Sequence, residues 1–384
     1  MSKFILQGKL VYDGAVLDPG VLICEEGKIT YAGPSRGERP DLTHSSGYIV
    51  PGYVDIHVHG ANGSDVMDGT TAAVHDIAKS LSAYGVTSFL ATTLTAGIEQ
   101  LHAVLTACKQ AAQSAVGGAE LLGVHLEGPW INPKHKGAQN GSHVIGPTLE
   151  EAQALLQSGE GLVKLVTMAP ETPNASAVIA YLTSQGVNVS VGHSDATYEQ
   201  VKAAIPHGLG HVTHCYNAMR PLHHREPGVV GAAMYHDELT AELIADGIHV
   251  HPVAMSILYR LKHSDGLVLV SDGMRAVGME DGSYDLGGLN VVMQNGEARL
   301  EDGTLAGSTL TLEKAVQNMV NLCGVPLPDA VKMASETPAR VIGAGERKGR
   351  LASGFDADFL LLDRQLNVSA VYRGGQLIHQ RHSD

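Results

Sequence analysis

Residues 51–60, PGYVDIHVHG, place a Pro-Gly turn directly before a short strand in which apolar and polar residues alternate. Successive side chains of a strand point to opposite faces, so this period of two puts His57 and His59 on the same side. A helical pattern follows in TTAAVHDIAKSLSAYG, residues 70–85, where apolar residues recur at intervals of three and four from Val74 to Leu81. A strand followed at once by an amphipathic helix predicts the βα unit of a parallel sheet.

The same alternation continues along the middle of the chain. The predicted strands are VDIHVHG (54–60), VTSFLATT (86–93), LLGVHLEG (121–128), LVKLVTMA (162–169), VNVSVGHS (187–194), GHVTHCYN (210–217), TAELIADGIHV (240–250) and LVLVSDGM (267–274). The helical patterns between them are HAVLTACKQAA (102–112), LEEAQALLQ (149–157), ASAVIAYLTSQG (175–186), YEQVKAAI (198–205) and HPVAMSILYRL (251–261). Eight such units over roughly 290 residues predict an α/β fold, a TIM-like (β/α)8 barrel. The competing fold, an open doubly wound sheet, normally carries a GxGxxG turn, which does not occur here.

Both ends of the chain have a different texture. The first fifty residues contain the short strand patterns KFILQGKLVYDG, VLICEEGKITYAG and GYIV, separated by turn residues. The last thirty or so contain ADFLLLD and SAVYRGGQLIH, with a Gly pair between two strand patterns. We therefore expect β structure at both ends and the barrel between them.

Composition excludes several classes of protein. With 44% hydrophobic and 17% charged residues among 384, the chain should fold into a globular structure. The net charge of −14 argues against a nucleic-acid partner, which requires a basic stripe. The longest apolar runs are too short for a membrane span, so no membrane partner is expected. Four dispersed cysteines without a CxxC pair, together with an N-terminus that lacks a secretory signal, predict reduced thiols and a cytoplasmic location.

The chain has 20 histidines, and several of them lie where predicted strands end. The carboxyl ends of barrel strands converge on one face, so these residues would surround one small volume. Imidazole and carboxylate together are the ligand set of a catalytic zinc or similar divalent ion. Each residue alone has a plain alternative: a satisfied core histidine, an ordinary ion pair, or an Asp that caps the next segment. Their coincidence at strand ends favours a metal site within the volume that these residues surround; the residues at strand ends are His57, His59, Glu127, His193, His214, His249 and Asp272.

Motifs along nearly the whole chain resemble a known family. PGYVDIHVHG, HLEGPW, VGHS, THCYNAM, HHREPG, IADGIHV, LVSDG and SETPARVIG occur in this order and resemble the N-acetylglucosamine-6-phosphate deacetylases of the amidohydrolase superfamily. The resemblance implies hydrolysis of the acetamide of an amino-sugar phosphate to acetate and the free amine. It also implies a barrel of residues 51–348, beside a small β-sandwich made of residues 1–50 and 349–384, in a homodimer.

The resemblance assigns the metal ligands. Glu127, His193 and His214 match the principal ligands, and His57 and His59 match positions that hold a second ion in some members. One or two divalent ions per subunit are therefore expected, with zinc as the first expectation and iron, cobalt or manganese as alternatives. Such an ion would lower the pKa of a water molecule and polarise the amide carbonyl.

The resemblance also assigns the other site residues. Asp272 matches the catalytic group that takes a proton from water and returns it to the leaving nitrogen. Asn217, Ala218 and His249 match substrate-binding positions. Arg225 matches a residue that reaches the sugar phosphate from the neighbouring subunit, and its planar fork suits phosphate oxygens. The plain alternative for Arg225 is a solvated charge in a loop.

One position departs from the family pattern, and several functions remain open. Gln139 stands where several members carry a substrate-binding histidine; it can donate a hydrogen bond but cannot become cationic. The galacto epimer of the substrate is one alternative. Another is a different amidohydrolase with a carbamylated lysine on the fourth strand, although Lys164 lies early in its strand. The third is a catalytically inactive barrel that binds a partner, which the intact set of ligands disfavours.

Overall fold

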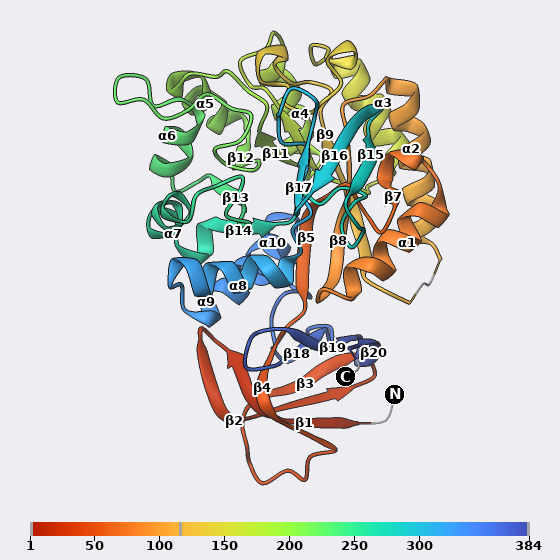
Figure 1. Cartoon of the computed structure of the whole chain (residues 1–384), viewed down its shortest axis with the longest axis vertical. Helices are drawn as coiled ribbons and strands as arrows, with labels where there is room; N and C mark the ends of the chain where they lie inside the picture. The colour runs from red at the N-terminus through yellow and green to blue at the C-terminus, as the bar shows by residue number, and fades with distance from the viewer. Residues whose placement is uncertain (1–2, 115–116, 382–384) are drawn as a thin grey trace.

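The computed structural model describes residues 3–114 and 117–381 and has two parts (Figure 1). Strands surrounded by helices form the larger part, and a smaller sheet below it contains both ends of the chain. Residues 1–2 and 382–384 of the predicted small domain lie outside the described residues. The chain passes from the small sheet to the larger part at residue 52, between β4 (Leu42–Pro51) and β5 (Tyr53–Val58), and returns to the small sheet through residues 342–358.

The larger part contains eight parallel strands in the order β14-β13-β12-β11-β10-β9-β8-β5. After β5 these are β8 (Val86–Thr93), β9 (Glu120–Glu127), β10 (Val163–Met168), β11 (Asn188–Val191), β12 (Leu209–Val212), β13 (Thr240–Ile244) and β14 (Leu267–Val270). The first and last strands meet just past their ends, where the amide of Asp272 donates to the carbonyl of His57 at 2.9 Å. Val58 and Gly273 form a parallel bridge at the same place. The predicted (β/α)8 barrel is confirmed, with all eight predicted strands in place.

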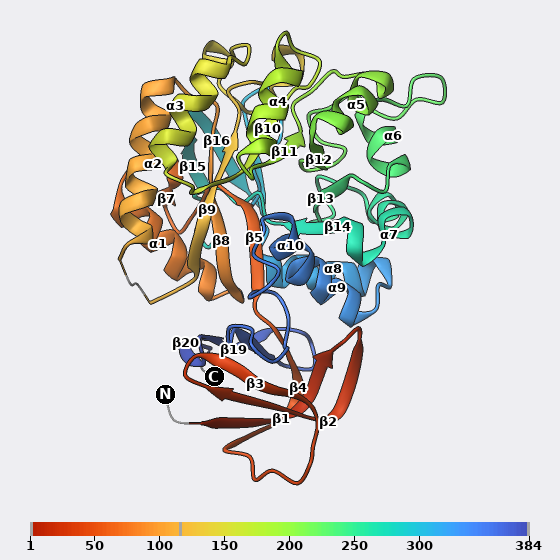
Figure 2. The ribbon, with the colours of Figure 1, turned by 180° about the vertical axis from the view of Figure 1, so that it is seen from behind.

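Helices cover the outside of the barrel, as the opposite views in Figures 1 and 2 show. They are α1 (Thr71–Ser82), α2 (Ile98–Ala112), α3 (Leu149–Gly159), α4 (Ala175–Ser184), α5 (Tyr198–Ala204), α6 (Gly228–Tyr235), α7 (Pro252–Gly266), α8 (Leu312–Cys323), α9 (Leu327–Ala334) and α10 (Glu336–Val341). Four of them, α1, α3, α5 and α8, follow a threonine whose hydroxyl accepts an amide of the first turn, which satisfies a donor that has no partner within the helix. In α1 the predicted apolar face from Val74 to Leu81 is buried.

The smaller part is one continuous seven-stranded sheet in the order β20-β19-β18-β4-β1-β2-β3. Besides β4 its strands are β1 (Phe4–Tyr12), β2 (Ala15–Glu25), β3 (Lys28–Pro34), β18 (Phe359–Leu362), β19 (Val368–Arg373) and β20 (Gln376–Gln380). β4 lies between β1 and β18, so the two ends of the chain meet at this strand. The expected β structure at both ends is confirmed, whereas the domain limits at 50/51 and 348/349 stay predictions.

Short elements close the carboxyl end of the barrel. Between β14 and α8 the chain forms an antiparallel sheet of β15 (Gly282–Leu286), β16 (Leu289–Gln294) and β17 (Glu297–Arg299). Other short elements are β6 (Gly60–Ala61), β7 (Ser64–Asp65), η1 (Val66–Asp68), η2 (Pro133–His135), η3 (Gly141–His143) and η4 (Ile205–His207).

Within the described part of the chain, none of the helices combines the length and apolar character that a membrane crossing requires.

Candidate active site

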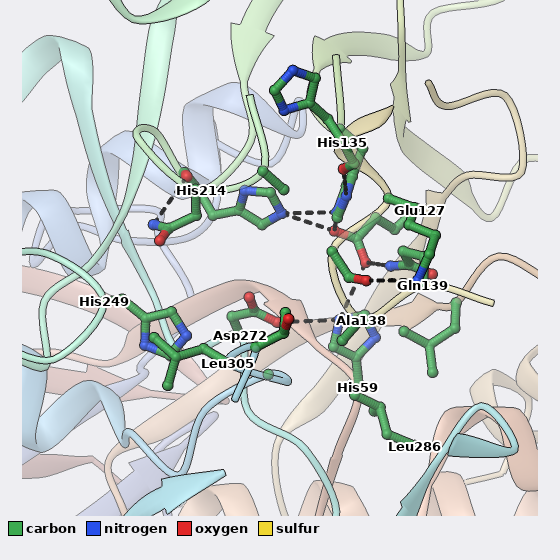
Figure 3. A pocket seen from close by; sticks show the side chains of 18 of the residues that line it. His59, Glu127, His135, Ala138, Gln139, His214, His249, Asp272, Leu286 and Leu305 are labelled. Carbon is green, nitrogen blue, oxygen red and sulfur yellow. Dashed lines mark hydrogen bonds and ion pairs between the residues drawn. The ribbon is translucent and has the colours of Figure 1, made fainter. Parts of the chain in front are cut away.

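A cavity of about 570 Å³ opens at the carboxyl ends of the barrel strands. Its volume falls in the range of small-molecule sites, roughly 300 to 1,000 Å³. The loops after β9 and β14 supply part of its wall, including Gln139, Leu286 and Leu305. Figure 3 shows these side chains around His59, Glu127, His214 and Asp272. The cavity therefore lies where a barrel fold positions its catalytic groups.

Three side chains meet at the floor of this cavity. Oε1 of Glu127, the last residue of β9, lies 3.1 Å from Nε2 of His193 and 3.1 Å from Nε2 of His214. The two Nε2 atoms are also 3.1 Å apart. His193 and His214 follow β11 and β12 with φ angles of 48° and 29°, a left-handed conformation that is uncommon outside glycine. This strained conformation interrupts the extended backbone at each residue and turns both rings toward Glu127.

The hydrogen bonds of His193 show what these three atoms can hold. Nδ1 of His193 lies 2.9 Å from the carbonyl oxygen of His135, and only an N–H can donate there. In the neutral ring Nε2 then carries a lone pair, which faces the Glu127 carboxylate and the ring of His214. Lone pairs and negative charge at this spacing repel each other unless a cation lies among them. Glu127, His193 and His214 therefore fit a divalent metal ion, for which this donor set is typical.

A second group shares Glu127 with the first. Nε2 of His59 lies 3.4 Å from Oε2 of Glu127 and 3.2 Å from Oδ1 of Asp272. Nε2 of His57 lies 3.4 Å from Oε1 of Glu127 and 3.6 Å from the same Asp272 oxygen, and it is buried without a hydrogen-bond partner. Nδ1 of His59 lies 3.2 Å from the carbonyl oxygen of Thr92, which it meets as a donor. A carboxylate shared by two sets of imidazoles is suited to a two-ion site.

The buried carboxylates and histidines of this centre shift one another's pKa values. Burial alone would raise the pKa of Glu127, but the charge of His57 and the contacts with His193 and His214 hold it well below its usual range. Burial alone would lower the pKa of His57, yet the neighbouring carboxylates, including Asp272, raise it well above its usual value. The pKa of Asp272 is also lowered: burial opposes ionisation, and the charge of His57 and contacts with His59 outweigh it. Asp272 is thus a carboxylate at neutral pH, the form that a general base requires.

A third group of metal-ligand type, formed by His57, His125 and Glu242, lies beneath the cavity. Both ring nitrogens of His125 have partners, the carbonyl of Ile56 at 3.2 Å and the hydroxyl of Thr167 at 2.7 Å. Burial lowers the pKa of His125 to about 3, so its ring is neutral. This group supports the site from below and leaves no ring nitrogen of His125 for an ion.

A model of the amidohydrolase family matches residues 48–378. The chain belongs to the amidohydrolase family. It is 38% identical over 374 residues to the N-acetylglucosamine-6-phosphate deacetylase of Bacillus subtilis, an alignment that covers 96% of this chain and 94% of the relative. It is 42% identical over 329 residues to the N-acetylgalactosamine-6-phosphate deacetylase of Escherichia coli O157:H7, with 86% and 87% covered.

Solved structures agree with this membership. A mutant of the N-acetyl-D-glucosamine-6-phosphate deacetylase from Mycobacterium smegmatis, in complex with N-acetyl-D-glucosamine-6-phosphate, superimposes with a TM-score of 0.94 at 35% identity; 98% of this chain and 100% of that chain are covered. The deacetylase of Thermotoga maritima gives a TM-score of 0.88 at 34% identity, with 99% of each chain covered. Amidohydrolases depend on metal ions, and the described residues include groups that could hold one.

The structure brings most of the predicted site residues of this amidohydrolase together. The cavity is lined by His59, Glu127, Gln139, His193, His214, Asn217, Ala218, His249 and Asp272. His57 lies directly beneath and is fully buried. His249 is oriented by Asp246, whose carboxylate lies 2.6 Å from Nδ1 of the ring. The individual roles of these residues stay predictions.

Gln139 uses its amide to hold Glu127. Its Nε2 donates to Oε2 of Glu127 at 2.6 Å, and its Oε1 accepts the amide of Thr95 at 2.7 Å. The second contact fixes which end of the amide is which, so the NH2 group must face Glu127. One hydrogen of that group is left for a substrate oxygen. The sequence predicts that Gln139 contacts the substrate; the structure shows that it also holds Glu127 in place.

Arg225 does not line the cavity of its own chain. It lies exposed in the loop between β12 and α6, and one of its guanidinium nitrogens contacts Nε2 of the neighbouring His224 at 2.7 Å. Figure 1 shows that this loop projects away from the barrel beside α5 and α6. A role for Arg225 in binding phosphate therefore requires a second chain.

Sequence reasoning missed one residue of the centre. Glu242 on β13 is fully buried and contacts the ring of His57 at 2.8 Å. The available signal was a lone carboxylate in the apolar strand TAELI, where an unpaired charge is costly. Lys164, the residue that a carbamylated two-metal site would need, is the second residue of β10 and lies away from the carboxyl end of that strand.

Proposed function

We propose that this amidohydrolase hydrolyses the acetamide of N-acetylglucosamine 6-phosphate and releases glucosamine 6-phosphate and acetate. The observation that carries the proposal is the convergence of Glu127, His193 and His214 beside Asp272 in one cavity. Relatives that share up to 39% identity over most of the chain carry this activity in their names. An inactive binding barrel would have no use for so complete a set of ligands and acid/base groups.

In the proposed mechanism Glu127, His193 and His214 would hold one divalent ion, and His57 and His59, together with Glu127, would hold a second. When bound, such an ion polarises the amide carbonyl, stabilises the developing negative charge and lowers the pKa of water. Zinc is our first proposal for its identity, with iron, cobalt and manganese as alternatives that the same nitrogen and oxygen donors accept.

Asp272 moves the proton in this mechanism. Its Oδ1 lies 3.6 Å from Nε2 of His57 and 3.2 Å from Nε2 of His59, so the carboxylate stands beside the proposed metal position and can accept a proton from the attacking water. Amide nitrogen is a poor leaving group until it is protonated, so Asp272 then returns the proton to that nitrogen. The C–N bond breaks as the amine takes up this proton, and acetate and the amino sugar leave.

The substrate phosphate needs positive charge in an acidic chain. Lys136 lines the cavity, and its Nζ contacts the carbonyl of Gly137 at 3.3 Å. Lys134 also lines the cavity but pairs with Asp195 at 2.8 Å. We propose that Arg225 of a second copy supplies the remaining charge in a homodimer.

An exposed apolar face beside the Arg225 loop supports the homodimer. Val253, Ile257 and Leu261 recur every four residues on α7 and are 61%, 44% and 46% exposed. Residues four apart on a helix share one face, so they form an apolar stripe. α7 packs on α6, which follows the Arg225 loop in the chain. A second copy on this stripe would cover it and bring each loop to the opposite chain.

Arg225→Ala should raise KM for the phosphorylated substrate about 10- to 100-fold, because a charge-assisted hydrogen bond contributes roughly 1.5 to 3 kcal/mol. The decisive measurement mixes this variant with Asp272→Asn under conditions that exchange subunits. The substrate concentration is kept far below the raised KM, so that each variant alone is nearly inactive. One site of the mixed dimer then contains an intact Asp272 and receives an intact Arg225 from its partner, so activity returns. The control is Arg364→Ala, which removes an exposed arginine from the turn between β18 and β19 and should leave KM unchanged. Absence of recovery in verified mixed dimers would contradict the shared site.

The galacto epimer is the second candidate substrate, because one relative at 42% identity bears that name. We expect acetate release from N-acetylglucosamine 6-phosphate to have the higher kcat/KM when both epimers are assayed at matched concentrations. Unphosphorylated N-acetylglucosamine is the control for the phosphate. A higher kcat/KM with the galacto epimer would replace the proposed substrate, and equal rates with and without phosphate would remove the phosphate from the proposal.

A further inference from the structure

Glu242 connects the two metal-ligand groups from behind. It lies in the middle of β13, and its side chain is fully buried inside the barrel. Its Oε2 lies 2.8 Å from Nδ1 of His57 and accepts the backbone amide of His214 at 3.0 Å. One carboxylate oxygen therefore contacts a residue of each group.

We propose that Glu242 is a positioning residue that directs Nε2 of His57 toward Glu127 and Asp272, and so governs whether an ion binds between His57 and His59. This inference rests on the proposed function, because it concerns the metal centre of the same site. It gives Glu242 no contact with substrate.

The ring of His57 explains why a carboxylate is needed at this place. A carboxylate accepts but cannot donate, so Nδ1 of His57 carries a proton at this contact, and Nε2 is the nitrogen that a metal ion would take. That Nε2 is the buried atom without a partner, and it points to the space between Glu127 and Asp272. A carboxylate behind an imidazole also increases its basicity and fixes the angle of its ring toward an ion.

Glu242 is itself held in a fixed orientation. Its Oε1 lies 3.2 Å from Nε2 of His211, and Nδ1 of His211 lies 2.6 Å from the hydroxyl of Thr240. Glu242, His57 and His211 are fully buried, so rotation of the carboxylate would leave charged or polar groups unpaired. The orientation of the His57 ring is therefore set by contacts that begin at His211 on β12 and Thr240 on β13 and reach it through Glu242.

The second contact of Oε2 concerns His214. The backbone of His214 has φ 29°, so its amide does not continue the hydrogen bonding of β12. Glu242 accepts that amide and satisfies a buried donor that would otherwise be costly. We therefore expect loss of Glu242 to affect the His57 and His59 position strongly and the Glu127, His193 and His214 position weakly. In the latter, Gln139 also holds Glu127, and the carbonyl of His135 also holds His193.

The test counts ions and measures their affinities, independently of activity. Metal-free wild type, Glu242→Gln and Glu242→Leu are titrated with zinc in the presence of a chromophoric chelator. We expect two ions in the wild type. The Kd of the weaker ion should rise about tenfold in Glu242→Gln and about a hundredfold in Glu242→Leu, the range reported for partners behind metal ligands. The Kd of the tighter ion should change by less than about threefold in Glu242→Gln.

The control is Glu313→Gln, which removes another buried carboxylate, on α8, where it accepts the amide of Val368. It should leave both affinities unchanged. Circular dichroism of each metal-free variant checks folding, and Glu242→Gln carries the conclusion if Glu242→Leu does not fold. One ion in the wild type, unchanged affinities in Glu242→Gln, or equal weakening of both ions would overturn the inference. Loss of the proposed function would appear separately, as absence of acetate release from the fully loaded wild type.

Discussion

Asp272→Asn is expected to fold, to bind metal and to lose about 10³-fold in kcat for acetate release. The amide of asparagine keeps the shape of the side chain but cannot accept a proton from water or return one to the leaving nitrogen, and general acid–base catalysis contributes roughly 10² to 10⁴. KM should change little, because Asp272 contacts the histidines of the centre, at 3.2 Å and 3.6 Å, and is not among the residues assigned to substrate binding. Steady-state kinetics together with metal analysis of the same sample measure the effect.

A matched control for this variant is Asp281→Asn. Asp281 is exposed, and its carboxylate accepts the amide of Asn295 in a turn of the sheet that closes the barrel. It should retain full activity. If Asp272→Asn keeps its ions and its kcat, another group must move the proton, and the proposed mechanism is wrong at that step.

Glu127→Gln should abolish activity by a different route, through loss of the ions themselves. Glu127 is the one residue common to both groups, and its two oxygens face four histidine nitrogens at 3.1 to 3.4 Å. An amide supplies only one oxygen, and that oxygen is neutral. Its NH2 group would face the lone pairs of the histidine rings, and the partial positive charge of that group repels a cation. We expect both ions to be lost at micromolar metal and kcat/KM to fall by more than about 10⁴-fold, since metal-assisted hydrolysis loses its Lewis acid.

Two comparisons separate this loss from misfolding. Metal-free wild type and metal-free Glu127→Gln should give similar circular dichroism spectra and similar unfolding temperatures. Gln139→Leu removes the side chain that donates to Glu127 at 2.6 Å and should weaken metal binding less than Glu127→Gln does. A Glu127→Gln protein that keeps two tightly bound ions would show that the centre is held by other residues.

Local periodicity in the sequence was enough to predict the barrel. A run such as VTSFLATT is buried along its whole length in β8, and such runs bounded by turns are recognised without knowledge of their neighbours. α6 was missed because GVVGAAMY is apolar on nearly every side and carries two glycines, so its sequence lacks the amphipathic period. α8 to α10 also lie outside the predicted helices, although α8 and α9 are amphipathic.

The site was predictable where strands position the residues. Glu127 ends β9, and Asp272 follows β14, so fold topology alone brings them to one face. Loop residues were harder, because no strand sets their direction: Gln139 turned out to hold Glu127, and Arg225 does not line the cavity of its own chain. Glu242 was missed because its importance lies in partners that are 28 to 185 residues away in the chain.

The position of β4 between β1 and β18 sets an order of events during synthesis. The ribosome produces β4 about 300 residues before β18, which at roughly 5 to 20 residues per second leaves one edge of β4 unpaired for about 15 to 60 s. All eight barrel strands emerge within that interval, so the catalytic part can close first. The N-terminal sheet meanwhile presents a strand edge with the apolar residues Ile49 and Val50, the kind of surface that recruits other chains. We therefore expect the nascent chain to be most prone to aggregation after the barrel has formed and before β18, β19 and β20 have been synthesised.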